Sequence, residues 1–231
     1  NNLKGYKYLI WGTWDNKDSL SHKAIVSFNS DEMLPEYREL FRVEPSKSDV
    51  YKRINTDTIW YYWTNILRPR ALLALYNQQM STSEKSTSRQ FIDDIKEITG
   101  HTTEELFSLI ENDFLIALKN SPEEQFIPIP RLLFAIKTSN PEELYRVIEN
   151  VTDFYEIPLS KQSINGADIY LWGGVIPTGD LQPTFCVTDN YLVISSNRQQ
   201  IKEFLLSEDG YPSLDSNPRF LEVTRGISDQ N

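Results

Sequence analysis

Acidic and aromatic side chains stand close together at two points in the chain, and this combination could serve sugar chemistry. Asp57 precedes an aromatic stretch that contains Trp60, and Asp168 precedes Trp172. Most glycosidases place two carboxylates on either side of the glycosidic bond that they cleave. The spacing does not by itself bring Asp57 and Asp168 together, and acids at strand ends are common. Glycoside chemistry is therefore an alternative and not the leading interpretation.

The stretch Ile59-Trp-Tyr-Tyr-Trp63 is the most unusual feature of the sequence. In a strand, successive side chains point to opposite faces, so Ile59, Tyr61 and Trp63 would share one face. Trp60 and Tyr62 would occupy the other face. Burial of both faces, between helices and a neighbouring unit, is the favoured interpretation, whereas exposure would indicate a glycan, peptide or protein surface. Trp60, Tyr62 and Trp63 are the candidate binding residues, and no residue is assigned as catalytic.

The other reactive side chains do not form a recognisable site. His22 and His101 lie in predicted polar turns far apart in the sequence, so they predict neither a metal site nor a proton relay. Asp93, Asp94 and Glu97 could form a cation-binding patch, but their spacing is more typical of the solvated face of a helix. We therefore predict no metal and no cofactor.

The single cysteine, Cys186, excludes an intrachain disulfide and a cysteine-built zinc site. It stands in the strand-like run Thr-Phe-Cys-Val-Thr, and no histidine is near it in sequence. We therefore expect a buried, unreactive thiol.

Composition narrows the class of partner. The chain has 231 residues, 39% of them hydrophobic, which is typical of a globular protein. The formal charge of −10 argues against nucleic acid and against anionic membranes, because both require clustered Lys and Arg.

No apolar run approaches the roughly 20 residues of a membrane-spanning helix, and no signal peptide opens the chain. The sequence begins without an initiator methionine, which leads us to expect a mature or truncated product.

Hydrophobic periodicity and turn residues predict helices interspersed with strands that are joined by short turns. This pattern indicates an α+β protein with a mostly antiparallel sheet. The predicted strands are Tyr6–Trp14, Lys23–Asn29, Thr58–Thr64, Phe114–Leu118, Arg131–Lys137, Ser160–Ile164, Asp168–Trp172, Thr184–Thr188 and Tyr191–Ser195. Helices are predicted near Ser30, from Pro69, over Gln90–Thr99, from Thr102 to near Glu111, from Asn140, over Asn197–Leu206 and from Asn217 to Gly226. Ser81–Ser88 is predicted to be a mobile loop.

Two stretches of the chain resemble each other. Gly5–Gly12 and Gly166–Gly173 both place Trp directly before the second glycine. Downstream of each, a strand ends in Asn just before a helix, in Ile25–Asn29 and in Val193–Asn197. In the second stretch, a longer turn and an extra strand come before that strand. The same residue order within the same element order predicts an internal structural repeat.

The repeat also sets the predicted domain organisation. Residues 1–50 would be the C-terminal part of a first unit and residues 51–231 a second unit, both packed in one globular body. Trp11 and Trp172 would then be equivalent core positions of a duplicated unit.

The second unit resembles an uncharacterised bacterial family, called domain of unknown function 3352, over roughly residues 54–223. The resemblance rests on the segments Ile54–Ile59, Leu106–Leu118, Arg131–Lys137, Asn140–Leu144 and Ser213–Phe220. Members of that family look exported or anchored to a membrane by an N-terminal segment. The resemblance therefore implies an extracytoplasmic location, but it implies no reaction and no catalytic residues.

Two hypotheses about function follow. The first is a non-enzymatic, extracytoplasmic binding or scaffold protein of bacterial origin, with a protein or glycan partner. It predicts no cleft with convergent titratable groups, and one apolar patch or sheet edge open to a partner. The alternative is a carbohydrate-binding module or glycoside-acting enzyme that uses exposed Trp and paired carboxylates. It predicts Trp rings facing solvent beside two carboxylates roughly 5–10 Å apart.

Overall fold

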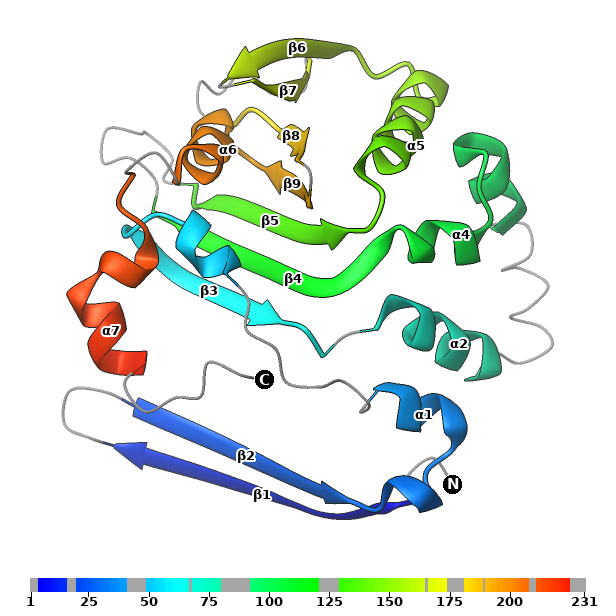
Figure 1. The fold of residues 1–231 in the computed structure, drawn as a ribbon, viewed down its shortest axis with the longest axis vertical. Coiled ribbons are helices and arrows are strands. Elements are labelled where there is room, and N and C mark those ends of the chain that lie inside the picture. Colours follow the sequence, from blue (N-terminus) through cyan, green and yellow to red (C-terminus); the bar gives the residue numbers. More distant parts are fainter. Residues whose placement is uncertain are drawn as a thin grey trace.

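The computed structural model contains two separate β-sheets, and helices pack around the larger one (Figure 1). It describes residues 4–15, 20–40, 49–66, 68–79, 92–120, 129–164, 166–173, 181–188, 190–207 and 211–224. The predicted α+β class with a mostly antiparallel sheet is confirmed, because every strand pair of the larger sheet is antiparallel. The loop predicted at Ser81–Ser88 lies outside the described residues.

Each predicted strand forms. The strands are β1 Tyr6–Asp15, β2 Leu20–Phe28, β3 Thr58–Thr64, β4 Ile110–Lys119, β5 Arg131–Thr138, β6 Leu159–Ile164, β7 Ala167–Trp172, β8 Thr184–Val187 and β9 Tyr191–Ser195. β1 and β2 form a hairpin of their own. The other seven form one sheet in the order β3-β4-β5-β9-β8-β7-β6.

Five helices, those that start at Pro69, Thr103, Pro141, Arg198 and Pro218, begin where the sequence predicts them. The helices are η1 Ser30–Glu32, α1 Pro35–Leu40, η2 Val50–Arg53, α2 Pro69–Gln79, α4 Thr103–Ser108, α5 Pro141–Phe154, α6 Arg198–Leu205, η4 Leu214–Ser216 and α7 Pro218–Thr224, and residues 92–99 are also helical. Among the helices that the structure describes, none combines the length and the apolar character that crossing a membrane requires.

Helix α4 ends earlier than its sequence predicts. The capping box at Thr102 predicts a helix to near Glu111, but β4 already begins at Ile110. The carbonyl of Leu109 accepts hydrogen bonds from the Thr138 hydroxyl and from the backbone N–H of Ser139, at 2.8 and 3.0 Å. These bonds fix the chain at the start of a strand, and no local sequence pattern could have indicated them.

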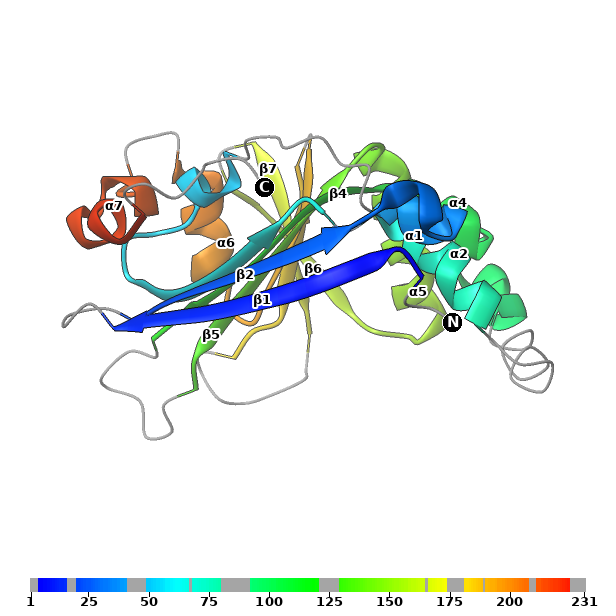
Figure 2. The same ribbon diagram turned by 90° about the horizontal axis from the view of Figure 1, so that it is seen from below.

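The larger sheet carries a hydrophobic core on each face. On one face, buried side chains of β4, β5, β7, β8 and β9 meet Ile201 and Phe204 of α6. On the other face, side chains of β5, β7, β8 and β9 meet Leu144 and Val147 of α5. Figure 2 shows the strands from below, with α6 and α7 on one side and α5 on the other. The sheet is therefore the middle layer of the molecule.

The hairpin β1–β2 lies beyond β3, at the lower end of the view in Figure 1. It is joined to the rest of the molecule through η1 and α1, and α1 contacts α2. Gly5 begins the hairpin with a φ of +94°, and its carbonyl accepts a hydrogen bond from Asn29 N–H at 2.7 Å. A Cβ at Gly5 would lie 2.6 Å from the Met33 side chain, so the turn requires glycine.

A junction joins the entry to β3 with the segment before α7. The backbone N–H of Leu214 donates to the Ile54 carbonyl at 2.8 Å, and Thr56 N–H donates to the Pro212 carbonyl at 3.2 Å. The Asn217 side chain adds a bond to the Thr56 carbonyl at 3.0 Å. These bonds hold the entry to β3 against the segment before α7.

The two resembling stretches differ in topology. β7 and β9 are separated by β8, whereas β1 pairs directly with β2. One local feature is shared, because Asn29 and Asn197 each follow a strand and accept a hydrogen bond from the amide two residues ahead. The expectation that Trp11 and Trp172 occupy equivalent core positions is wrong, because Trp11 is 66% exposed whereas Trp172 is partly buried.

Candidate functional site

β3 presents its aromatic side chains to opposite faces of the sheet, as strand alternation predicts. Tyr61 and Trp63 lie opposite Ala117 and Leu115 of β4, on the face that α6 covers. Trp60 and Tyr62 point to the other face. The alternation within this strand is therefore confirmed for its central residues.

The expectation that this strand is buried on both faces is wrong. Trp60 and Tyr62 are each 49% exposed, and Ile59 is 56% exposed. β3 is an edge strand of the sheet, and α5 packs farther along, against β8 and β9. No helix of the described part of the chain therefore covers the two aromatic rings.

Trp60 and Tyr62 belong to a continuous apolar surface on the sheet. Trp60 pairs with Leu118 and Tyr62 with Ile116, and these β4 residues pair in turn with Leu132 and Phe134 of β5. Leu132 is exposed, whereas Ile116, Leu118 and Phe134 are partly buried. We call this surface the open face: Trp60, Tyr62, Ile116, Leu118, Leu132 and Phe134.

Trp63 does not belong to the open face. Its indole N–H donates to an Asp113 oxygen at 2.6 Å, and the Tyr191 hydroxyl donates to the other oxygen at 3.1 Å. The ring is partly buried and packs against the core under α6. Of the three predicted binding residues, the structure brings two together and holds the third by a structural hydrogen bond.

The structure does not bring Asp57 and Asp168 together. Asp57 precedes β3, the first strand of the sheet, and Asp168 lies in β7, the sixth. Adjacent strands are about 4.8 Å apart, so five steps separate the two acids by roughly 24 Å. Each carboxylate pairs with a lysine, Asp57 with Lys119 at 2.8 Å and Asp168 with Lys161 at 2.6 Å. These two residues therefore do not form the acid pair that the glycoside-acting alternative would need.

A pair of acids does meet at Lys119, which sequence analysis did not single out. The Lys119 ammonium lies 2.8 Å from Asp57 and 2.8 Å from Glu203 of α6. The lysine is buried and stands between the two carboxylates. It forms an ion pair with each of them, and the arrangement ties α6 to the end of β4.

The remaining polar candidates occupy structural positions. His22 lies in the hairpin with its ring against Trp11, and His101 pairs with Glu143 of α5 at 2.9 Å. The helix at residues 92–99 exposes Asp93, Asp94 and Glu97 on one face. Within the described ranges, no group of three or more His, Cys, Asp or Glu side chains is placed to hold a metal ion.

Cys186 lies in the core, as its sequence context predicts. The side chain is fully buried in β8. Burial raises the pKa of the thiol to about 12, because the charged thiolate loses its hydration. The thiol is therefore neutral at physiological pH and unsuited to be a nucleophile.

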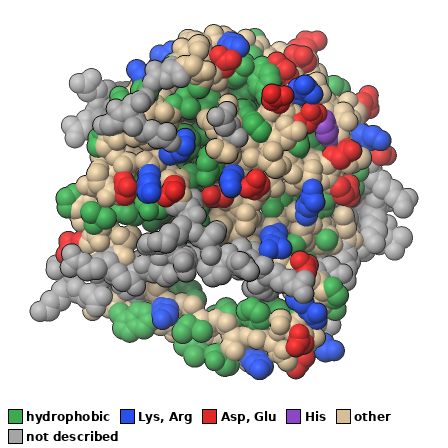
Figure 3. All heavy atoms as spheres, viewed as in Figure 1, with side chains coloured by type: hydrophobic (Ala, Val, Ile, Leu, Met, Phe, Trp, Pro, Cys, Tyr) green, Lys and Arg blue, Asp and Glu red, His purple; other side chains and the backbone are tan. Residues whose placement is uncertain are grey.

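The hairpin exposes apolar side chains on both of its faces. Tyr8, Ile10 and Trp14 point to one face, and Leu9 and Trp11 to the other. All five are at least half exposed. Figure 3 shows hydrophobic side chains along the hairpin at the bottom of the view, whereas acidic and basic side chains are interspersed over the body above it.

Comparisons with known proteins show no match: no family model, no curated protein and no solved structure is similar to this chain.

Proposed function

We propose that the protein is a non-enzymatic binding or scaffold module that holds a protein partner against the open face. One observation carries the proposal: two large aromatic rings, Trp60 and Tyr62, stand half-exposed on an apolar sheet face that no described helix covers. Exposed apolar patches of this kind mark interaction sites in soluble proteins. The cost of leaving them in water is offset when a partner covers them.

A protein partner suits the shape and chemistry of this surface. The open face lies across three neighbouring strands, β3, β4 and β5, and it is built from aromatic and aliphatic side chains. Tyr and Trp are enriched at the centres of protein interfaces and among the residues that contribute most binding energy. We expect the partner to present an apolar surface of its own.

Carbohydrate binding is the second candidate, because Trp60 and Tyr62 expose ring faces that a sugar could contact. A glycoside-acting enzyme is less well supported. Asp57 and Asp168 belong to opposite halves of the sheet, and the carboxylates of Asp57 and Glu203 are both paired with Lys119.

The proposal includes an extracytoplasmic location, a bacterial origin and membership of the family called domain of unknown function 3352. The sequence resemblance over residues 54–223 supports all three. It also includes a repeat organisation, with residues 1–50 ending a first unit and 51–231 forming a second. The matching asparagine caps at Asn29 and Asn197 support the repeat.

Site-specific photo-crosslinking tests the proposal. A benzophenone amino acid replaces Tyr62 in the whole chain, which is expressed in the organism of origin, and crosslinked products are identified by mass spectrometry. The same probe at Tyr155, which is 59% exposed at the end of α5, is the matched control. We expect one defined protein adduct at position 62 and none at position 155.

Affinity measurements with the purified partner complete the test. Trp60→Ala should weaken binding about 30-fold, the loss typical of a central interface aromatic residue, while Tyr155→Ala leaves the affinity unchanged. Circular dichroism checks that Trp60→Ala remains folded. Equal adducts at both positions, or an unchanged affinity, would refute the proposal. Binding to a glycan array that Trp60→Ala abolishes would favour the second candidate.

A further inference from the structure

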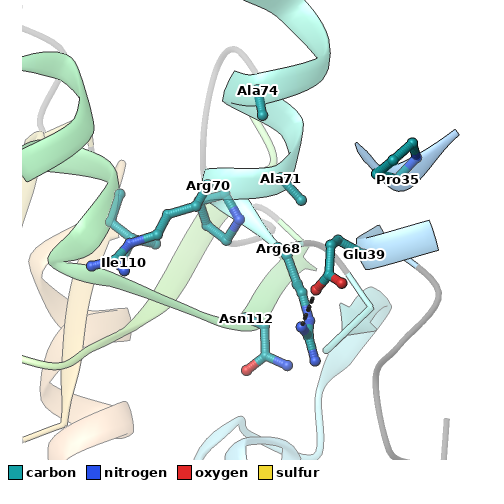
Figure 4. A pocket seen from close by; sticks show the side chains of 9 residues that line it. Pro35, Glu39, Arg68, Arg70, Ala71, Ala74, Ile110 and Asn112 are labelled. Carbon is teal, nitrogen blue, oxygen red and sulfur yellow. Dashed lines mark ion pairs between the residues drawn. The ribbon is translucent and has the colours of Figure 1, made fainter. Parts of the chain in front are cut away.

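A groove runs along α2, away from the open face. It consists of two adjoining hollows of about 600 and 430 Å³, and both are lined by Arg70 and Ala74. These volumes fall within the range of small-molecule sites in proteins. Figure 4 shows the larger hollow, where α2 faces Pro35 and Glu39 from the α1 side and Ile110 and Asn112 of β4.

The groove exists because α2 presents a small residue between two longer ones. Arg70, Ala74 and Asn77 are spaced at i, i+4 and i+7, so they share one side of the helix. The methyl group of Ala74 leaves unfilled space between α2 and its neighbours α1 and α4. The walls of the larger hollow are mainly apolar: Pro35, Pro69, Ala71, Ala74 and Ile110.

Two charges at the groove lack a counter-charge. The side chains of Arg70 of α2 and Glu104 of α4 make no hydrogen bond or ion pair within the described ranges, with each other or with another residue, and both residues are exposed. Their neighbours are engaged: Arg68 pairs with Glu39 at 3.6 Å, and Glu105 caps α4. The groove therefore offers a free cation and a free anion beside an apolar hollow.

We propose that this groove binds a short zwitterionic peptide with apolar side chains. The peptide carboxylate pairs with Arg70, whose guanidinium matches a carboxylate with two parallel hydrogen bonds. The amino group pairs with Glu104, and the apolar side chains fill the larger hollow. A simple anion fits less well, since Glu104 would repel it, and an uncharged apolar ligand would leave both charges unused.

Isothermal titration calorimetry of the whole chain with the dipeptide Leu-Leu tests this inference. We expect saturable binding that weakens at least about ten-fold in Arg70→Met and in Glu104→Gln, because each removes one charge-assisted contact. N-acetyl-Leu-Leu-amide, which lacks both charges, should bind no better than these variants. Arg219→Met and Glu222→Gln, which change exposed charges on α7, should bind as the unmodified chain does.

Two further results decide the outcome. Ala74→Leu, which fills the groove from the exposed side of α2, should abolish binding while the thermal unfolding midpoint stays close to that of the parent chain. Failure of Leu-Leu to bind, equal affinity for the blocked dipeptide, or unchanged affinity in both charge variants would each overturn the inference.

Discussion

Lys119 connects three elements through one ammonium group. It stands at the end of β4 and pairs with Asp57 before β3 and with Glu203 of α6. The side chains of Lys119 and Glu203 are only 10% and 11% exposed, so both charges have lost most of their hydration. Each needs the other, because an uncompensated buried charge is costly.

Removal of this ammonium should therefore destabilise the fold. We expect Lys119→Met to lower the free energy of unfolding by about 3 kcal/mol, because Glu203 is left buried without a counter-charge. Urea denaturation followed by circular dichroism measures the change. Lys137→Met is the matched control, since Lys137 forms a more exposed strand ion pair with Glu111, and it should cost less than about 1 kcal/mol.

The double variant Lys119→Met/Glu203→Met distinguishes loss of the pair from loss of packing. It should recover most of the stability, because no charge is left buried. A double variant no more stable than Lys119→Met would show that the lysine stem, and not its charge, is what the fold requires.

Among the helices, α4 depends most visibly on its first turn. It has only six residues, and the Thr102 hydroxyl accepts from the Glu105 N–H at 3.2 Å. The Glu105 carboxylate accepts in return from the Thr102 N–H at 2.7 Å. The pKa of Glu105 lies below its ordinary value of 4.5. The hydrogen bond from the Thr102 backbone is the largest cause of the lowering, and the hydrogen bond from the Thr102 hydroxyl is the second.

The lowered pKa of Glu105 predicts how the stability of α4 depends on pH. The carboxylate stabilises the folded chain above its ordinary pKa of 4.5, and the contribution is lost as the pH falls through the lower folded-state pKa. Glu105→Gln should therefore be less stable than the parent chain at pH 7 and match it at strongly acidic pH. Thermal unfolding of both proteins across this range measures the difference, and a gap that does not depend on pH would contradict the assignment.

Local sequence signals predicted the elements well, but they could not predict which faces are covered. The capping box at Thr102, Asn140 before α5 and Asn197 before α6 each act within a few residues, so the sequence displays them directly. The exposure of Trp60 depends on where α5 packs and on β3 being the edge of the sheet. Such contacts join residues far apart in sequence, and strand periodicity contains no information about them.

For the same reason, the sequence predicted only part of the candidate site. Alternation correctly separated Trp63 from Trp60 and Tyr62, but the aliphatic members of the open face come from β4 and β5. The groove along α2 gave no local signal. Arg70 and Glu104 line the same hollow only because α2 packs against α4.

The whole molecule divides into a well-packed body and a hairpin that contributes nothing to its core. Both hydrophobic clusters are built from residues 50–220, and neither contains a side chain of β1 or β2. An isolated two-stranded hairpin is marginally stable in water. The hairpin therefore depends on the body much more than the body depends on the hairpin.

Deletion of the hairpin tests this division. A chain that lacks residues 1–29 should keep the circular dichroism spectrum of the seven-stranded sheet and an unfolding midpoint within about 5 °C of the parent, since each lost kcal/mol shifts the midpoint by about 2–4 °C. It should also be more soluble, because exposed side chains such as Trp11 and Leu9 are removed. Loss of cooperative unfolding would show that the hairpin is part of the folding unit.

The junction between the entry to β3 and the segment before α7 has a mechanical consequence. Its backbone bonds, Ile54 to Leu214 and Thr56 to Pro212, belong to antiparallel segments whose outer ends leave on the same side. A pull on the two ends of the body would load these bonds one after another, so they would open like a zipper at low force. Ile54 and Leu214, both buried at rest, would then reach the solvent.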